Sequence, residues 1–157
     1  MNSSRRTHSL ALSLLLACGA FPLIGCQQQP PHLPTAFALS KDQLSSQRWR
    51  IETVNDQPVP ANAPAWLEFS PKGMLSGKNG CNQLGGTYQL TGAKLQLSQL
   101  SSTMMACQND GDSDWENRIN QVLGEVRSVT RPAPEVLSLH NVEGKTIMQL
   151  RAITSTS

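Results

Sequence analysis

The chain has 157 residues, enough for one ordinary folded domain. Its formal net charge is +2 at pH 7, and Arg5 and Arg6 account for the whole excess. The other charges balance, with 11 basic and 11 acidic residues and no polybasic run, so we expect no nucleic-acid partner.

Residues 1–25 have the pattern of a secretory signal peptide. Two arginines precede an apolar stretch, residues 10–24, that is too short for a comfortable transmembrane helix. The stretch leads into Leu23-Ile24-Gly25-Cys26, which resembles the lipobox of bacterial lipoproteins. We therefore expect cleavage before Cys26 and a lipid on its sulfur, which makes the membrane a partner. The alternative is a plain signal peptide with an incidental cysteine.

Residues 26–43 are predicted to tether a domain to this lipid. The run Gln27-Gln28-Gln29-Pro30-Pro31-His32-Leu33-Pro34 is polar and rich in proline, so it cannot build a core and favours extended polyproline geometry. An Asp directly after the lipidated cysteine would be the usual signal for retention in the inner membrane, and Gln27 occupies that position. We therefore expect an anchor in the outer membrane, with the domain facing the periplasm.

Residues 44–153 carry the patterns of a folded domain, and residues 154–157 form a polar tail. Short stretches of alternating apolar and polar residues recur between turn-forming residues, as expected for strands. The predicted strands cover residues 49–54, 65–69, 74–77, 86–90, 94–97, 126–130, 136–140 and 146–150. Strands this short and this closely spaced predict an antiparallel meander or a small barrel.

One helix is predicted among these strands. Ser113 and Glu116 match the Ser-x-x-Glu capping box that opens a helix, and Gly124 can end it in a left-handed conformation. The apolar residues in between recur at helical spacing: Trp115, Ile119, Val122 and Leu123. Strands, one helix and further strands predict the α+β class with a dominant sheet.

Two cysteines remain beyond Cys26 in the expected mature chain. Cys81 follows the turn sequence Gly77-Lys78-Asn79-Gly80, and Cys107 lies shortly before the predicted helix. The envelope is an oxidising compartment, so a disulfide between them is the simplest expectation. Closing a loop of this length contributes about 3 kcal/mol to stability. The bridge would tie the turn to the start of the helix.

Three segments around these cysteines belong together: Gly80-Cys81-Asn82, Gly86-Thr87-Tyr88 and Thr103-Met104-Met105-Ala106-Cys107. Further matches lie in the first and last strands, at Trp49, Val54-Asn55, Leu137-Ser138-Leu139 and Met148-Gln149-Leu150. In this order and spacing, the chain resembles the META-domain family and its HslJ-like lipoproteins over about residues 44–151. The resemblance implies a mostly antiparallel sheet that forms a small incomplete β-barrel with one packed helix. HslJ-like members are associated with the cell envelope, heat stress and tolerance of novobiocin.

The residues that match the family signature also form a predicted turn: Asn79, Gly80, Asn82, Thr103 and Met104. No catalytic residues are established for the family, so the resemblance transfers none, and it implies no cofactor. A tight, hydrogen-bonded turn needs small and polar residues of this kind. We interpret the set as a structural corner, with a binding site as the alternative.

Reactive sites can also be assembled from these residue types. Cys81, His140 and Asn82 could serve as nucleophile, base and orienting group, but the oxidising compartment and Cys107 oppose a free thiolate. Cys81, Cys107 and His140 could bind zinc, but they lack a convincing fourth ligand and paired-ligand spacing. We therefore expect no catalytic residues and no metal site.

The acidic stretch 109–114 alternates oxygen-bearing side chains as a calcium loop does. However, Trp115 and Gln121 stand where an EF-hand requires glycine and glutamate. Acidic residues at this place are explained by the positive end of the helix dipole. We prefer this structural interpretation.

The function that these patterns indicate is that of a non-catalytic envelope lipoprotein. It would bind at the membrane surface during stress or exposure to an antibiotic of the novobiocin type. An incomplete barrel offers an apolar mouth or an uncovered edge, so the partner is an envelope protein or a small apolar ligand. The alternatives are a periplasm-facing carrier of a small ligand or lipid, and an enzyme with an unrecognised site.

Overall fold

The computed structural model describes residues 39–107 and 110–153, which belong to the second of two units of the chain, residues 33–157. The predicted signal peptide, the predicted lipidation site Cys26, most of the predicted tether and the polar tail lie outside the described residues. None of the described helices is long and apolar enough to cross a membrane.

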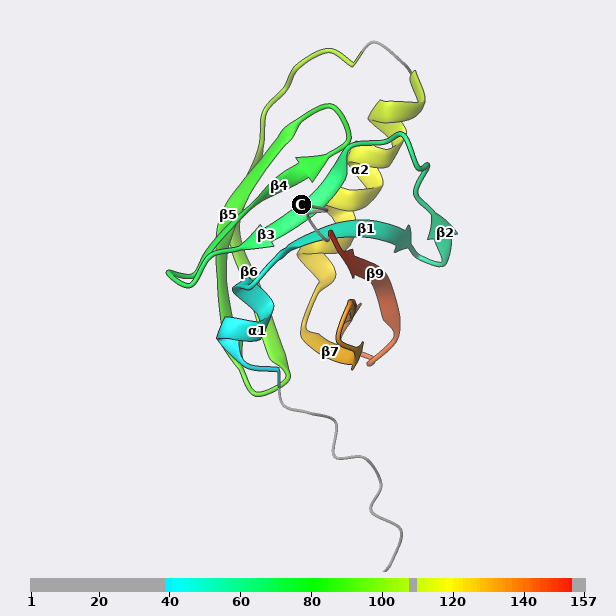
Figure 1. Ribbon diagram of the computed structural model, residues 1–157. Coiled ribbons are helices and arrows are strands. Elements are labelled where there is room, and N and C mark those ends of the chain that lie inside the picture. The colour runs from blue at the N-terminus through cyan, green and yellow to red at the C-terminus, as the bar shows by residue number, and fades with distance from the viewer. Residues whose placement is uncertain (1–38, 108–109, 154–157) are drawn as a thin grey trace, which may run out of the picture. The chain divides into compact units, whose positions relative to one another are not determined.

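The described residues form nine strands and two helices (Figure 1). The strands are β1 (Arg48–Val54), β2 (Gln57–Pro58), β3 (Ala65–Phe69), β4 (Met74–Asn79), β5 (Gln83–Thr91), β6 (Lys94–Ser102), β7 (Ser128–Ala133), β8 (Val136–His140) and β9 (Thr146–Ala152). The helices are α1 (Lys41–Ser45) and α2 (Asp110–Glu125). Every strand pairs antiparallel with its neighbours, so the predicted α+β class with a dominant antiparallel sheet is confirmed.

The strands form a hydrogen-bonded ring in which β6 and β7 are only weakly paired. The order is β1-β3-β4-β5-β6-β7-β8-β9, and β9 closes the ring by pairing with β1. The short β2 pairs with the last two residues of β1, Thr53 and Val54. Between β6 and β7 the described register has a single pair, Lys94 with Ser128. Beside it, the Leu95 amide donates to the Arg127 carbonyl at 3.1 Å. The ring therefore fits the predicted incomplete barrel, with its gap along β6.

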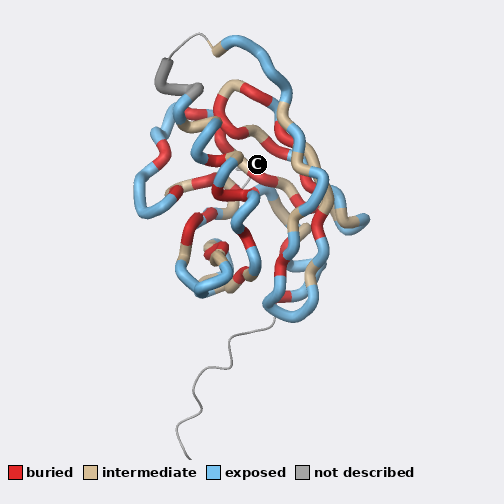
Figure 2. Tube along the Cα trace, turned by 180° about the vertical axis from the view of Figure 1, so that it is seen from behind, coloured by how far each residue is buried: buried red, intermediate tan, exposed pale blue. Residues whose placement is uncertain are grey.

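Side chains fill the interior of this ring. Buried residues recur along the strands of the ring (Figure 2). In β3 they alternate with half-buried ones, as expected for a strand with one face on a core. The α2 side chains that join the core are those predicted from helical spacing, except Trp115, which is only half-buried. The fully buried strand residues include Trp49, Leu67, Phe69, Leu95, Leu137, Leu139, Met148 and Leu150.

The helix boundaries differ from those predicted. α2 begins at Asp110, before Ser113, and Gly124 lies inside it without a left-handed conformation. The Arg127 guanidinium donates to the carbonyl oxygens of Gly124 and Val126, at 2.9 and 2.7 Å. Because a side chain satisfies these terminal carbonyls, a left-handed glycine cap is not needed.

A second helix, α1, was not predicted. Ser40 opens it with a capping box, in which its hydroxyl accepts from the Gln43 amide at 3.1 Å and the Gln43 side chain accepts from the Ser40 amide at 2.9 Å. The buried Trp49 indole donates to the Leu44 carbonyl at 2.9 Å, which fixes the helix on the end of the sheet. The folded part therefore starts before the predicted boundary at residue 44.

The predicted strand at 126–130 is shifted in the structure. β7 covers Ser128–Ala133, and its register with β8 slips between Thr130 and Ala133. This irregularity accommodates Pro132, which has no amide hydrogen to donate to a neighbouring strand. Pro132 therefore lies inside β7, beyond the end of the predicted strand.

Candidate functional site

The turn between β4 and β5 forms one wall of the candidate site. Gly80 has a φ of 126°, which favours glycine, and the Asn79 amide donates to the Asn82 carbonyl at 3.3 Å across the turn. Gly77 lies so close to β3 that an added Cβ would overlap the Trp66 carbonyl oxygen. The glycines of this segment therefore permit a tight reversal that brings two buried asparagines next to each other.

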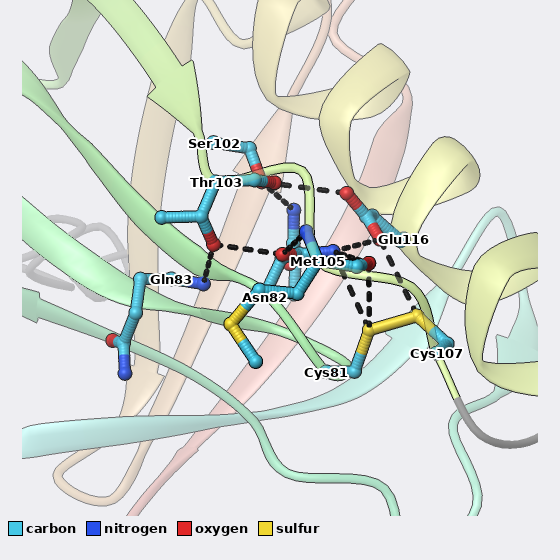
Figure 3. The surroundings of a disulfide bond; sticks show 9 residues. Cys81, Asn82, Gln83, Ser102, Thr103, Met105, Cys107 and Glu116 are labelled. Atoms are coloured by element: carbon cyan, nitrogen blue, oxygen red, sulfur yellow. Dashed lines mark hydrogen bonds between the residues drawn. A yellow bond between two sulfur atoms is a disulfide. The ribbon is translucent and has the colours of Figure 1, made fainter.

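Asn82 is the centre of the site (Figure 3). Its side chain is 1% exposed. Its carbonyl oxygen accepts from the Thr103 hydroxyl at 2.7 Å and from the Met105 amide at 2.8 Å. Its amide nitrogen donates to the Met105 carbonyl at 3.2 Å and to Glu116 Oε2 at 2.7 Å. One side chain thus joins the turn, the segment after β6 and helix α2.

Asn79 makes a second connection from the same turn. It is fully buried, and its amide nitrogen donates to Asn120 Oδ1 at 2.7 Å and to the Ser102 hydroxyl at 3.1 Å. Its oxygen Oδ1 has no hydrogen-bond partner among the described residues. Leaving a buried acceptor unsatisfied costs stability, so Asn79 is held less well than Asn82.

The predicted disulfide between Cys81 and Cys107 is present, with a Cα–Cα distance of 5.8 Å. Glu116 Oε2 lies 3.8 Å from Cys107 Sγ, and the Met105 carbonyl oxygen lies 3.9 Å from Cys81 Sγ (Figure 3). The Asn82 amide donates to both of these oxygens, so the hydrogen-bond network and the bridge form one corner. We call the residues around Asn82, Glu116 and the bridge the disulfide corner.

The two remaining signature residues behave differently. Thr103 belongs to the corner, since its hydroxyl donates to Asn82 and accepts from the Gln83 amide at 3.0 Å. Met104 is 98% exposed and none of its side-chain atoms takes part in the described network. The predicted turn is therefore a corner built by Asn79, Asn82 and Thr103, with Met104 pointing to solvent.

His140 lies elsewhere, between Thr130 and Thr146. Its Nε2 is 2.8 Å from the Thr130 hydroxyl and its Nδ1 is 3.2 Å from the Thr146 hydroxyl. Burial lowers the pKa of His140, against a smaller opposing effect of a hydrogen bond to the Gly144 backbone. Among the described residues, the group that could hold a metal ion with the two cysteines contains Glu116 and no histidine. The zinc set and the nucleophile–base pair considered from the sequence both require His140, and neither is assembled by the described residues.

The acidic stretch that was compared with a calcium loop is helical from Asp110 onward. Asn109 lies outside the described residues. An EF-hand loop keeps a dozen residues out of helical conformation to wrap the ion. A helical backbone cannot wrap an ion in this way, so the helix dipole remains our interpretation of the acidic residues.

Sequence reasoning missed Glu116, Asn120 and Ser102 as members of the corner. The sequence predicts a capping box of Glu116 with Ser113, but the Glu116 carboxylate faces Asn82 and accepts from the Ser102 hydroxyl at 3.4 Å. The available signal was spacing: Glu116 and Asn120 are four residues apart, on the side of the helix that also carries the core residues Ile119 and Leu123.

This ring of antiparallel strands is a known kind of domain. The family model of the META domain matches residues 42–153, and the chain belongs to this family. Among individual proteins, it is similar to heat shock protein HslJ of Escherichia coli strain K12, with 30% identity over 128 residues. The match covers 81% of this chain and 82% of HslJ.

Solved structures share the fold. A protein from Burkholderia xenovorans, solved by NMR, is 26% identical with a TM-score of 0.59, covering 73% of this chain and 87% of that one. A second NMR structure is 28% identical with a TM-score of 0.58, covering 72% and 94%. A DUF4847 family protein from Bacteroides vulgatus is 15% identical with a TM-score of 0.51, covering 71% and 96%, which shows the fold alone.

Proposed function

We propose that this META-domain protein is anchored by a lipid on Cys26 in the outer membrane and acts by binding a partner at the membrane surface, without turning over a substrate. Its role would lie in tolerance of heat or of antibiotics of the novobiocin type. The lipobox-like sequence before Cys26 supports the anchor. The similarity to a protein named heat shock protein HslJ supports a role in stress.

The observation that carries the proposal is the filled interior of the ring. Trp49, Phe69 and Met148 have no exposed surface, and buried side chains from α2 pack with them. A carrier for a lipid or a small apolar ligand needs an interior cavity of several hundred Å³. Two hollows, of about 330 and 400 Å³, have charged residues such as Arg50, Arg151, Lys94 and Arg127 in their walls. This favours recognition at the outer surface over transport inside the ring.

The contacts of the chemically reactive side chains also favour binding over catalysis. Cys81 is joined to Cys107, and the Glu116 carboxylate accepts from Asn82 and Ser102. His140 is placed between two threonine hydroxyls. Each of these groups has a structural partner, and such an arrangement stabilises a fold without activating a nucleophile.

A rescue experiment tests whether display at the membrane matters. A null strain should regain heat or novobiocin tolerance from the full chain. A soluble periplasmic form of equal abundance, made by exchanging the signal sequence and removing Cys26, should rescue poorly. His140→Ala in the full chain should rescue fully, because we assign this residue no catalytic task. Full rescue by the soluble form, together with none by His140→Ala at normal abundance, would show that the protein is an enzyme.

A further inference from the structure

The disulfide corner brings together three side chains of metal-ligand type. Among the residues that the structure describes, Cys81 Sγ, Cys107 Sγ and a Glu116 carboxylate oxygen form one group within 4.8 Å of one another. All three residues are half-buried, so small solutes can reach them from solvent. The stick view shows the carboxylate beside the two bonded sulfurs (Figure 3).

The Glu116 carboxylate has no cationic partner in the described part of the chain. The salt bridges there involve Glu68 and Glu52. Glu116 instead accepts from the neutral groups Asn82 Nδ2 and Ser102 Oγ. A bonded disulfide sulfur carries no hydrogen, so the 3.8 Å contact between Glu116 Oε2 and Cys107 Sγ is not a hydrogen bond. A negative charge therefore faces two sulfurs that cannot donate to it.

We propose that reduction of the bridge converts this corner into a binding site for one Zn²⁺ ion, held by the thiolates of Cys81 and Cys107 and the carboxylate of Glu116. A dithiol reductant breaks the S–S bond by supplying two electrons and two protons, and it leaves as its own cyclic disulfide. Zn²⁺ then displaces the two thiol protons to solvent, because the thiolate is the ligand. The closed bridge has no thiolate, so metal binding depends on the redox state.

The distances suit tetrahedral zinc. Zn–S and Zn–O bonds of about 2.3 and 2.0 Å place two sulfur ligands about 3.8 Å apart, and a sulfur and an oxygen about 3.5 Å apart. Cys107 Sγ and Glu116 Oε2 are already 3.8 Å apart. Once reduced, the sulfurs cannot stay at bonding distance, so they separate toward the spacing that the ion requires.

The neighbours of the site can complete it. A water molecule can supply the fourth ligand atom, as in zinc sites with three protein ligands. The Met105 carbonyl oxygen lies nearby, 3.9 Å from Cys81 Sγ. The Asn82 amide donates to this carbonyl and to Glu116, so it orients two oxygens at once. Groups that orient ligands in this way typically change metal affinity by about 10–100-fold.

Zinc titration of the full chain tests the proposal. Cys18 and Cys26 are first replaced by serine, so that the bridge supplies the only thiols and the result does not depend on the anchor. The protein is reduced with excess dithiol, desalted without oxygen and titrated with Zn²⁺ against a chromophoric chelator. We expect one Zn²⁺ per reduced chain and none per oxidised chain. Substitution of Co²⁺ should give a thiolate-to-metal charge-transfer band.

Glu116→Gln should weaken Zn²⁺ binding by the reduced chain at least about tenfold. The matched control is Glu125→Gln on the same helix, an exposed residue that should leave the affinity unchanged. Far-UV circular dichroism of each reduced variant establishes that the titrated chain is folded, and Zn²⁺ should raise the thermal midpoint of the reduced chain. Equal affinities of Glu116→Gln and Glu125→Gln, equal binding by the oxidised chain, or no binding by a folded reduced chain would each overturn the proposal.

Discussion

Replacing Asn82 by alanine should lower the free energy of unfolding by about 4 kcal/mol. The side chain makes three hydrogen bonds to neutral oxygen or nitrogen groups, each worth about 1 kcal/mol, and one to the Glu116 carboxylate, worth about 1.5–3 kcal/mol. Part of this loss is recovered by water, because Thr103 and Met105 are exposed residues. In the mutant, the Glu116 carboxylate loses its hydrogen bond from Asn82. Among the described side chains, the Ser102 hydroxyl still donates to it.

Asn79→Ala is the matched control, since it removes the same side chain from a buried position in the same turn. Asn79 makes two described hydrogen bonds, worth about 2 kcal/mol together. Its oxygen is buried without a partner, and removing that oxygen returns about 1–3 kcal/mol. The net loss should therefore be about 1 kcal/mol or less.

Urea unfolding of the oxidised proteins, followed by tryptophan fluorescence, measures both losses. The slope of the free energy against urea should be the same in all three proteins, so that the midpoints report stability directly. A loss for Asn79→Ala that equals or exceeds the loss for Asn82→Ala would refute this reasoning. It would mean that Asn79, and not Asn82, is the energetic centre of the disulfide corner.

Cys26→Ser should leave the protein unprocessed or mislocalised, because it removes the thiol on which lipid attachment is predicted. Stable membrane binding needs more than one acyl chain, so the loss of this lipid should not be tolerated. Mass spectrometry of the mature N-terminal peptide checks this, and an unacylated terminus that begins elsewhere would contradict it. Thiol counting under denaturing, non-reducing conditions should find Cys81 and Cys107 oxidised, and reduction should lower the thermal midpoint, since the bridge contributes about 3 kcal/mol; two free thiols in freshly isolated protein would contradict this. Burial lowers the pKa of His140 in the folded domain, so the unfolded chain takes up a proton first on acidification. Stability should therefore fall as the pH drops below the unfolded pKa of about 6.5. Urea unfolding of His140→Gln should show no such fall in stability. If the fall is unchanged in His140→Gln, another group causes it.

Much of the sheet could be predicted because its signal is local. In β3 and β8 the predicted and observed boundaries agree. In β3 the signal is alternation, which depends only on which face meets the core. The short helix α1 also had a local signal, the Ser40 and Gln43 capping box, which was not used. The pairing of Cys81 with Cys107 could be predicted from the number of cysteines and the expected oxidising compartment.

The hydrogen-bond partners of the corner could not be predicted in the same way. Glu116 has a plausible local partner in Ser113, and only the packing of α2 against the β4–β5 turn directs its carboxylate to Asn82. Asn120 reads as an ordinary helix residue until the fold places it beside Asn79. These contacts join residues 34 and 41 positions apart, so they depend on tertiary structure.

The position of α2 explains why the signature residues of the family gather at this corner. β7 pairs with β6 only at Lys94, and the remainder of β6 shares the walls of two hollows with α2. The helix therefore lies along the gap in the ring and covers the core there with Ile119, Val122 and Leu123. No ladder of backbone hydrogen bonds can hold a helix in such a gap, because a helix uses its own backbone groups internally. Asn79, Asn82 and the disulfide supply the missing attachments from the turn to α2 and the segment before it. This favours the structural interpretation of the signature: these residues close an incomplete ring.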